Sequence, residues 1–376
     1  MIDARRQALT KSCSKMETQQ VTNYTANAIT NATFILQEYG ILFCGLPKVG
    51  STFWKRTLTV LAKSHNYTSP FEMNLQQATR QLTTFGRYSR SHAPHEVQAA
   101  LNNISISFIF VRDPYSRLYS AYVDKLYMAN RGFWVRHGTK VVAMIRKNPS
   151  KESQSLGHDV TFPEFIKFIL LQYRKRERIN IHFAPMHTQC NGCAVPYSFI
   201  GHMETFSSDA EFLLNEWRTQ FDNFSIRFYD FEAESGIDTS QDTIYRLYSI
   251  KKRITEVQYP FYNILLRGWC FLQLRGYISK ETPFPFNESQ ALTVTREDYM
   301  HAVRQALAGR SNITKVKLQR TEALVQAYQS VPIDDMERLR EFLLKDCLMF
   351  GYDDRPKSFF ERPLLQANNH IYLDGL

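Results

Sequence analysis

A loop bracketed by two glycines carries the first residues with evident chemistry. The apolar run Ile41–Cys44 leads into Gly45-Leu46-Pro47-Lys48-Val49-Gly50-Ser51-Thr52. An apolar run followed by a Gly-containing turn and Ser-Thr predicts a strand, a loop and the start of a helix, where backbone N–H groups favour an anion. Lys48 adds a positive charge, and the hydroxyls of Ser51 and Thr52 can donate to phosphate oxygens. The stretch therefore predicts a phosphate-binding loop.

The loop differs from the G-x-x-x-x-G-K-[ST] pattern of ATP-binding loops. Gly45 and Gly50 have the separation of that pattern, but Ser51 stands where its lysine would be, and Lys48 lies inside the loop. We therefore expect a phosphate site without the usual arrangement of a triphosphate and magnesium.

A second run of apolar residues, Ile104–Val111, ends directly in Arg112-Asp113-Pro114. Asp113 is a favourable N-cap and Pro114 a favourable first residue, so we expect a helix from Pro114 to about Met128.

Two basic groups should therefore meet at one edge of a sheet. In a parallel sheet, Lys48 and Arg112 both leave the carboxyl ends of strands, where such folds bind ligands. Ser120 lies two turns into the expected helix, and with Arg112 it could hold a second phosphate separate from the one at Lys48. The alternative for Arg112 and Ser120 is an arginine paired with a carboxylate and a solvated helix position.

Two strand-to-helix units joined by a crossover indicate an α/β fold, with a P-loop-like central parallel sheet flanked by helices and a helical C-terminal part. We expect further strands at 198–202 and 225–231, helices at 51–64, 162–173, 207–221 and 334–346, mainly helical stretches at 238–274 and 297–328, and a basic surface loop region at 130–160. The expected division is a stem-like lead-in at 1–33, one domain at 34–355 and a tail at 356–376.

The composition is that of a globular protein, and its net positive charge is compatible with an anionic partner. The chain has 376 residues, of which 44% are hydrophobic and 22% charged, and a net charge of +10. This excludes a disordered chain and favours nucleic acid, a nucleotide or an acidic polysaccharide as partner. No apolar run approaches the ~20 residues of a membrane-spanning helix, and the N-terminus lacks the apolar core of a signal peptide.

Seven N-x-[ST] sequons nevertheless suggest a glycosylated lumenal protein. They begin at Asn23, Asn31, Asn66, Asn103, Asn223, Asn287 and Asn312.

Six cysteines are present, and two of them form a C-x-x-C at Cys190 and Cys193. A zinc ribbon needs a second such pair, which is missing, and His182 and His187 would complete an irregular ligand set. We expect a disulfide that involves this pair, with zinc and buried thiols as the alternatives.

At this point the motifs resemble a known family. Leu46–Thr52 is similar to the 5′-phosphosulfate loop of Golgi carbohydrate sulfotransferases, and Phe110–Tyr122 to their 3′-phosphate motif. The resemblance is strongest to the branch of chondroitin, dermatan and N-acetylgalactosamine 4-O-sulfotransferases. Three further stretches agree with it: His182-x-x-Pro185 before Cys190, Phe199–Thr205, and Phe350-Gly351-Tyr352.

The resemblance implies transfer of a sulfonate group from 3′-phosphoadenosine 5′-phosphosulfate (PAPS) to a glycan hydroxyl, without a metal. It implies that the catalytic Lys48 stabilises the leaving phosphate and that a histidine upstream of Arg112 acts as general base, His92 first and His95 second. The alternative for His92 is a surface loop residue without a catalytic role. Donor binding is then expected at Pro47, Lys48, Val49, Gly50, Ser51, Thr52, Phe53, Arg112 and Ser120.

The family also implies an acidic polysaccharide acceptor rather than nucleic acid, and a type II membrane protein of the Golgi lumen. The basic stretches at 131–147 and 174–178 are candidates for contact with this glycan, although the second is also typical of a solvated helix end. His182, His202 and Glu204 match family motifs as structural or acceptor-lining residues. The sequence differs from the family in lacking the membrane anchor and in a longer region between about 236 and 320.

Two other functions compete with this interpretation. A non-catalytic glycosaminoglycan-binding protein could retain the fold, but it would not need Lys48, Arg112 and Ser120 together. A P-loop kinase would need a Walker-type lysine and a metal-binding acid, which the sequence does not offer.

Overall fold

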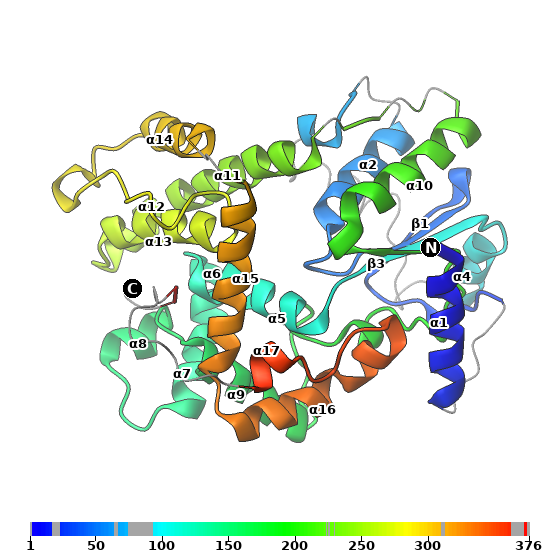
Figure 1. Ribbon diagram of the computed structural model, residues 1–376, viewed down its shortest axis with the longest axis horizontal. Helices are drawn as coiled ribbons and strands as arrows, with labels where there is room; N and C mark the ends of the chain where they lie inside the picture. The colour runs from blue at the N-terminus through cyan, green and yellow to red at the C-terminus, as the bar shows by residue number, and fades with distance from the viewer. Residues whose placement is uncertain are drawn as a thin grey trace. The chain divides into compact units, whose positions relative to one another are not determined.

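The computed structural model describes residues 2–16, 23–63, 67–73, 93–222, 224, 226–228, 230–309, 313–361 and 372–373 (Figure 1). The chain divides into two compact units. The first comprises Met1–Arg117, Ile179–Glu234 and Glu341–Asp354, and the second Leu118–Arg178, Ser235–Arg340 and Arg355–Leu376.

The first unit is built on a four-stranded sheet in the order β1-β2-β3-β4. Its strands are β1 (Thr33–Leu36), β2 (Ile41–Cys44), β3 (Ile106–Val111) and β4 (Phe199–His202). The pairs β2–β3 and β3–β4 are parallel, which confirms the predicted parallel core, whereas β1 adds an antiparallel edge that we did not predict.

Helices α1 (Ile2–Lys15), α2 (Ser51–Lys63), α4 (Pro94–Leu101) and α10 (Phe206–Gln220) complete most of the first unit. Aromatic side chains join α2 and α10 to the sheet, since the ring of Trp54 lies 5.7 Å from Trp217 and 4.9 Å from Phe108 between centroids. Figure 1 shows α2 and α10 side by side in this unit. Buried aromatic pairs of this kind contribute about 0.5–1.5 kcal/mol each beyond the area they bury, so this face of the sheet is firmly fixed.

The second unit is helical. It contains α6 (Arg131–Phe133), α7 (Thr139–Ile145), α8 (Lys151–Leu156), α9 (Phe162–Arg174), α12 (Lys251–Glu256), α13 (Phe261–Leu274), α14 (Arg296–Ala308), α15 (Ile313–Gln329) and α17 (Lys357–Phe360). The chain passes from one unit to the other inside α5 (Pro114–Tyr122), α11 (Phe231–Ser249) and α16 (Ile333–Phe350). The predicted helices at 51–64, 162–173, 207–221 and 334–346 are thus confirmed.

Two predictions are wrong. Residues 130–160 do not form a surface loop region, because they include α6, α7, α8 and a π-helical turn at Trp134–Gly138, and their side chains Trp134, Val141, Val142 and Leu156 are buried. No strand is assigned to the described residues between 224 and 230, and Phe231 begins α11.

Among the residues that the structure describes, no helix is long and apolar enough to cross a membrane. Helix α1, in the predicted lead-in, is bound to the rest of the first unit by an ion pair between Arg5 and Asp209 and by the disulfide Cys13–Cys193.

Candidate functional site

The Lys48 loop follows β2 and precedes α2, as the sequence predicts, and its backbone is unusual. Lys48 has φ of +71° and Gly50 has φ of +77°. A side chain on Gly50 would collide with the ring of Phe206, so glycine is required there. For a lysine, the left-handed region costs about 1–2 kcal/mol, which the surrounding contacts must offset. Such local strain is typical of functional sites.

Two of the predicted donor-binding residues offer only their backbone. Val49 is fully buried. The ring of Phe53 packs in a cluster of aromatic side chains that includes Phe206 and Phe231, with centroids 5.3 and 5.6 Å away. An anion at the start of α2 would therefore meet backbone N–H groups at these two positions.

The loop is held from behind by Arg117, to which the sequence analysis gave no role. Its Nε donates to the carbonyl of Pro47 over 3.1 Å, and its Nη1 and Nη2 donate to the carbonyls of Ala184 and Ile181 over 2.8 and 3.3 Å. Burial lowers the pKa of Arg117 to about 10, and the charge of Asp346 opposes this shift. Arg117 thus joins the Lys48 loop to residues 181–184.

The position of Arg117 along α5 indicates that this arginine is buried. The residue lies three positions after Pro114 and four before Ala121, both buried, so it belongs to the buried face of the helix. A charged residue on a buried face needs several hydrogen-bond partners, which predicts a bridging role.

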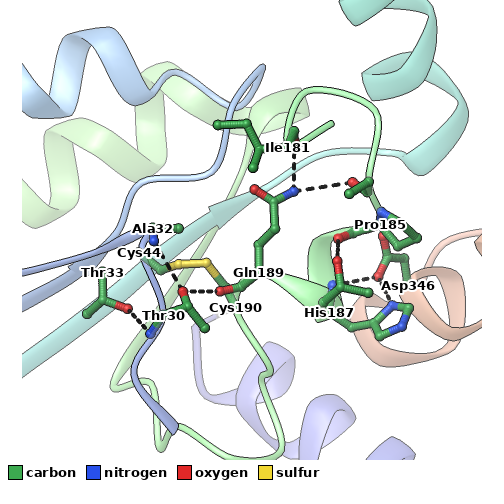
Figure 2. Close-up of a disulfide and its surroundings, with 12 residues drawn as sticks. Thr30, Ala32, Thr33, Cys44, Ile181, Pro185, His187, Gln189, Cys190 and Asp346 are labelled. Atoms are coloured by element: carbon green, nitrogen blue, oxygen red, sulfur yellow. Dashed lines mark hydrogen bonds and ion pairs between the residues drawn. A yellow bond between two sulfur atoms is a disulfide. The ribbon is translucent and has the colours of Figure 1, made fainter. Parts of the chain in front are cut away.

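The segment that Arg117 reaches is itself fixed at several points (Figure 2). Cys190 forms a disulfide with Cys44, the last residue of β2. The buried carboxylate of Asp346 accepts from the backbone N–H groups of Met186 and His187 over 2.5 and 2.8 Å. Together with Arg117, these links fix residues 181–190, the segment to which Arg117 joins the Lys48 loop.

Arg112 follows the last residue of β3, so it leaves the same edge of the sheet as the Lys48 loop. Asp113 caps α5, because its carboxylate accepts from the N–H of Ser116 over 2.7 Å, as predicted. Burial raises the pKa of Asp113, although the hydrogen bonds from Ser116 oppose this shift.

The loop after β4 supports the Arg112 turn. Glu204 accepts from the backbone N–H of Asp113 over 3.1 Å and from the hydroxyl of Tyr352 over 2.9 Å. The ring of Tyr352 stacks on His202 at 5.2 Å. Burial lowers the pKa of His202, and the charge of Arg5 adds to this effect. These contacts support the structural role predicted for His202 and Glu204.

The other predicted residues that the structure describes lie in α4, in α5 and at the end of α9. Ser120 is a buried residue of α5 and belongs to the second unit. His95 is exposed near the start of α4, and His92 lies outside the described residues. The basic run 174–178 is exposed at the end of α9, as expected of a solvated helix end.

Both cysteines of the C-x-x-C motif form disulfides, Cys190 with Cys44 and Cys193 with Cys13. The predicted disulfide is confirmed, and the zinc alternative is wrong because no thiolate of the motif is available. Within the part of the chain that the structure describes, no cluster of His, Cys, Asp or Glu could hold a metal ion.

Comparison with known proteins agrees with the motifs. The model of the sulfotransferase family matches residues 31–258. Carbohydrate sulfotransferase 11 of Rattus norvegicus is 32% identical over 47% of this chain and 50% of its own length. Carbohydrate sulfotransferase 14 of Mus musculus is 34% identical over 49% of this chain and 45% of its length. These matches confirm the resemblance to carbohydrate sulfotransferases.

A longer match is found to carbohydrate sulfotransferase 8 of Mus musculus, at 26% identity over 69% of this chain and 60% of that protein. The chain therefore spans about half the length of the curated relatives it matches. No solved structure matches it significantly.

Proposed function

Because the chain belongs to the sulfotransferase family, we propose that it transfers the sulfonate group of PAPS to a hydroxyl of a glycan. The observation that carries this proposal is the pairing of a strained Lys48 loop with Arg112 at one edge of the parallel strands β2 and β3. PAPS supplies an activated sulfonate whose bond to the 5′-phosphate breaks as the bond to the acceptor oxygen forms.

Lys48 is the proposed catalytic residue. Its ammonium group would donate to the oxygen that gains negative charge as the 5′-phosphate leaves. One well-placed donor of this kind is worth about 3–4 kcal/mol in the transition state. The hydroxyls of Ser51 and Thr52 and the backbone of residues 47–53 would bind the 5′-phosphate itself.

Arg112 and Ser120 are proposed to bind the 3′-phosphate of the donor. Both belong to the stretch that resembles the family's 3′-phosphate motif. The backbone bond from Asp113 to Glu204 supports this role for Arg112, since it fixes the turn on which the arginine lies.

The acceptor hydroxyl needs a general base, which contributes about 100- to 10,000-fold in such reactions. We propose His92 for this role and His95 as the second choice. His92→Ala should lower kcat strongly while donor affinity stays unchanged. An unchanged kcat would exclude His92 as the base.

The acceptor is proposed to be an acidic glycan. Arg136, Lys140 and Lys147 are exposed on or near α7 and are available to sulfate or carboxylate groups. Arg146 is a weaker candidate, because it pairs with Asp159 and Glu164.

We propose a location in the Golgi lumen, with membrane anchoring as in the family. Two disulfides are typical of proteins that fold in an oxidising compartment. The four sequon asparagines that the structure describes, at positions 23, 31, 103 and 287, are all exposed and thus open to glycosylation.

The proposal is tested by incubating the full chain with PAPS labelled in its sulfonate group and with chondroitin, dermatan, heparan and N-glycan acceptors, with EDTA present. Label should appear on at least one glycan with the wild type and with the control Lys345→Ala, an exposed lysine of α16. It should be almost absent with Lys48→Ala. Equal labelling by Lys48→Ala would refute the role of Lys48, and binding of glycans without any transfer would favour a non-catalytic protein.

A further inference from the structure

The strongest unexplained feature lies beside Ser120, in the second unit. Ser120 is buried, and the group that meets its hydroxyl is the guanidinium of Arg275, with Nη1 3.5 Å from Oγ. The two residues are 155 positions apart in sequence, so the fold brings them together.

The end of α13 places Arg275 and its neighbour Tyr277. Gly276 has φ of +71°, its N–H donates to the carbonyl of Gln273, and the N–H of Tyr277 donates to that of Leu272. This is the double hydrogen bond of a Schellman motif, which ends a helix and turns the chain sharply. Arg275 therefore points from the last turn of α13, and Tyr277 returns beside it.

Aromatic rings position the guanidinium. Its carbon lies 5.9 Å from the ring centroid of Phe271 and 5.9 Å from that of Tyr277. Tyr277 in turn packs against Gly236, where an added side chain would approach its ring to 3.3 Å. Burial alone would raise the pKa of Tyr277, but the charge of Arg275 and the hydrogen bonds from Thr239, Ser235 and Arg275 lower it below its ordinary value.

The chemical environment of Arg275 differs from that of Arg146 and Arg246 in the same unit. Arg146 and Arg246 each pair with two carboxylates. Among the described residues, no carboxylate forms an ion pair with Arg275, and its guanidinium lies beside the hydroxyls of Ser120 and Tyr277 and the rings of Phe271 and Tyr277. A half-buried arginine with a neutral hydroxyl partner retains its capacity to bind an anion through two parallel N–H donors.

We propose that Arg275 is a further phosphate-binding residue, which acts with Ser120 on the 3′-phosphate of the donor. This inference rests on the proposed function, because Ser120 is assigned to that phosphate there. The hydroxyl of Ser120 supplies one donor and the guanidinium supplies charge and further donors, while Tyr277 holds the guanidinium in place.

The test compares two nucleotides that differ only in the 3′-phosphate. The full chain is titrated by calorimetry with adenosine 3′,5′-bisphosphate and with adenosine 5′-monophosphate. The wild type should prefer the bisphosphate, and Arg275→Gln should lower that preference about 10- to 100-fold, as expected for hydrogen bonds to a charged group. Arg275→Lys should retain part of the preference for the bisphosphate. Tyr277→Phe should lower this preference a few-fold.

Arg338→Gln is the matched control, since Arg338 is an exposed arginine of the same unit and pairs with Asp335. It should leave both affinities unchanged. If Arg275 has only a packing role, Arg275→Gln should lower the affinities for both nucleotides equally or leave both unchanged. Either result would overturn the proposal. Should Arg275→Gln fail to fold, an unchanged preference in both Arg275→Lys and Tyr277→Phe would overturn it as well.

Different results would contradict the proposed 3′-phosphate site and the role of Arg275. If the wild type binds the two nucleotides equally, the 3′-phosphate site of the proposed function is wrong, and the role of Arg275 falls with it. If the wild type discriminates and Arg275→Gln discriminates as well, only the inference about Arg275 is wrong.

Discussion

The Lys48 loop of the first unit and two arginines of the second unit, Arg146 and Arg246, are held by different kinds of interaction. In the first unit, the disulfide Cys44–Cys190 and a hydrogen bond from the buried Arg117 to Pro47 hold the Lys48 loop in place. In the second unit, ion pairs such as Arg146–Asp159 and Arg246–Asp124 join partly exposed side chains. Partly exposed pairs respond to salt and pH, whereas covalent links and buried hydrogen bonds do not respond in the same way. The links behind the Lys48 loop should therefore respond less to salt and pH than the pairs of Arg146 and Arg246.

The largest effect should come from the group that the first unit positions. Lys48→Ala should lower the rate of sulfonate transfer about 100- to 1000-fold, because one donor to the leaving oxygen is lost. The unfolding free energy in urea should stay close to that of the wild type, since the left-handed backbone at Lys48 is not a stabilising feature. Lys345→Ala serves as control, and a loss of stability with unchanged turnover would reverse the assignment.

The second-largest effect should come from removal of the disulfide Cys44–Cys190. The double variant Cys44→Ala, Cys190→Ala should lose about 2–4 kcal/mol of unfolding free energy. Trp54 and Trp217 report on the first unit and Trp134 and Trp269 on the second, so the Trp→Phe pairs allow each unit to be followed by fluorescence. The loss should appear with the first pair of probes. A loss seen with the second pair alone would contradict the proposed difference between the units.

A smaller effect is expected from Arg117→Met. Of the three hydrogen bonds that are lost, only the one to Pro47 reaches the Lys48 loop, and one hydrogen bond to a charged group is worth about 1.5–3 kcal/mol. Since Arg117 positions the Lys48 loop through Pro47, the KM for PAPS should rise more than kcat falls. Steady-state kinetics check this split, with Arg338→Met as control. An equal change in the two variants would mean that Arg117 has no part in donor binding.

The smallest effect should be the acid response of the second unit. Burial would raise the pKa of Asp159 and of Glu164, but hydrogen bonds from Ser153, Thr161 and Arg146 outweigh it and lower both values. The folded pKa values lie below the unfolded ones of about 4, so the unfolded state binds more protons in that window. The stabilisation that Asp159 and Glu164 contribute is therefore present above about pH 4 and is lost as the pH falls through their folded pKa values.

Urea midpoints between pH 6 and pH 3, followed with Trp134 and Trp269, measure this response. Arg146→Gln should flatten the pH dependence, because it removes the group that lowers both pKa values. A profile identical to that of the wild type would show that the pairs with Arg146 contribute nothing to acid stability.

The sequence predicts the first unit better than the second, for physical reasons. The runs Ile41–Cys44 and Ile106–Val111 are apolar throughout because both faces of these parallel strands are buried. The N-cap at Asp113 depends only on residues next to it in the chain, so the sequence predicts it. The antiparallel strand Thr33–Leu36 is too short to be distinguished from an apolar turn without its partner.

The missed elements had weaker local signals. In 130–160, the buried Trp134, Val141 and Val142 are separated by basic and turn-forming residues, which conceal the helical period. At 225–231, the alternation of Ile226 and Phe228 imitates a strand. Asp230 is in fact the cap of α11, since its carboxylate accepts from the N–H of Ala233 over 2.9 Å.

The supporting residues of the site could not be predicted by local rules. Arg117 lies 70 positions from Pro47 and 67 from Ala184, and Arg275 lies 155 from Ser120. The proposed chemistry-bearing residues stand in short motifs, whereas the residues that position them depend on long-range packing.

The most direct test of the proposed donor site is a binding measurement on the full chain without magnesium. Adenosine 3′,5′-bisphosphate and ATP are titrated separately, first with EDTA and then with magnesium. We expect tight binding of the bisphosphate in both conditions and much weaker binding of ATP, because the Lys48 loop lacks the Walker arrangement. Binding of ATP that requires magnesium and exceeds that of the bisphosphate would contradict the proposed donor site.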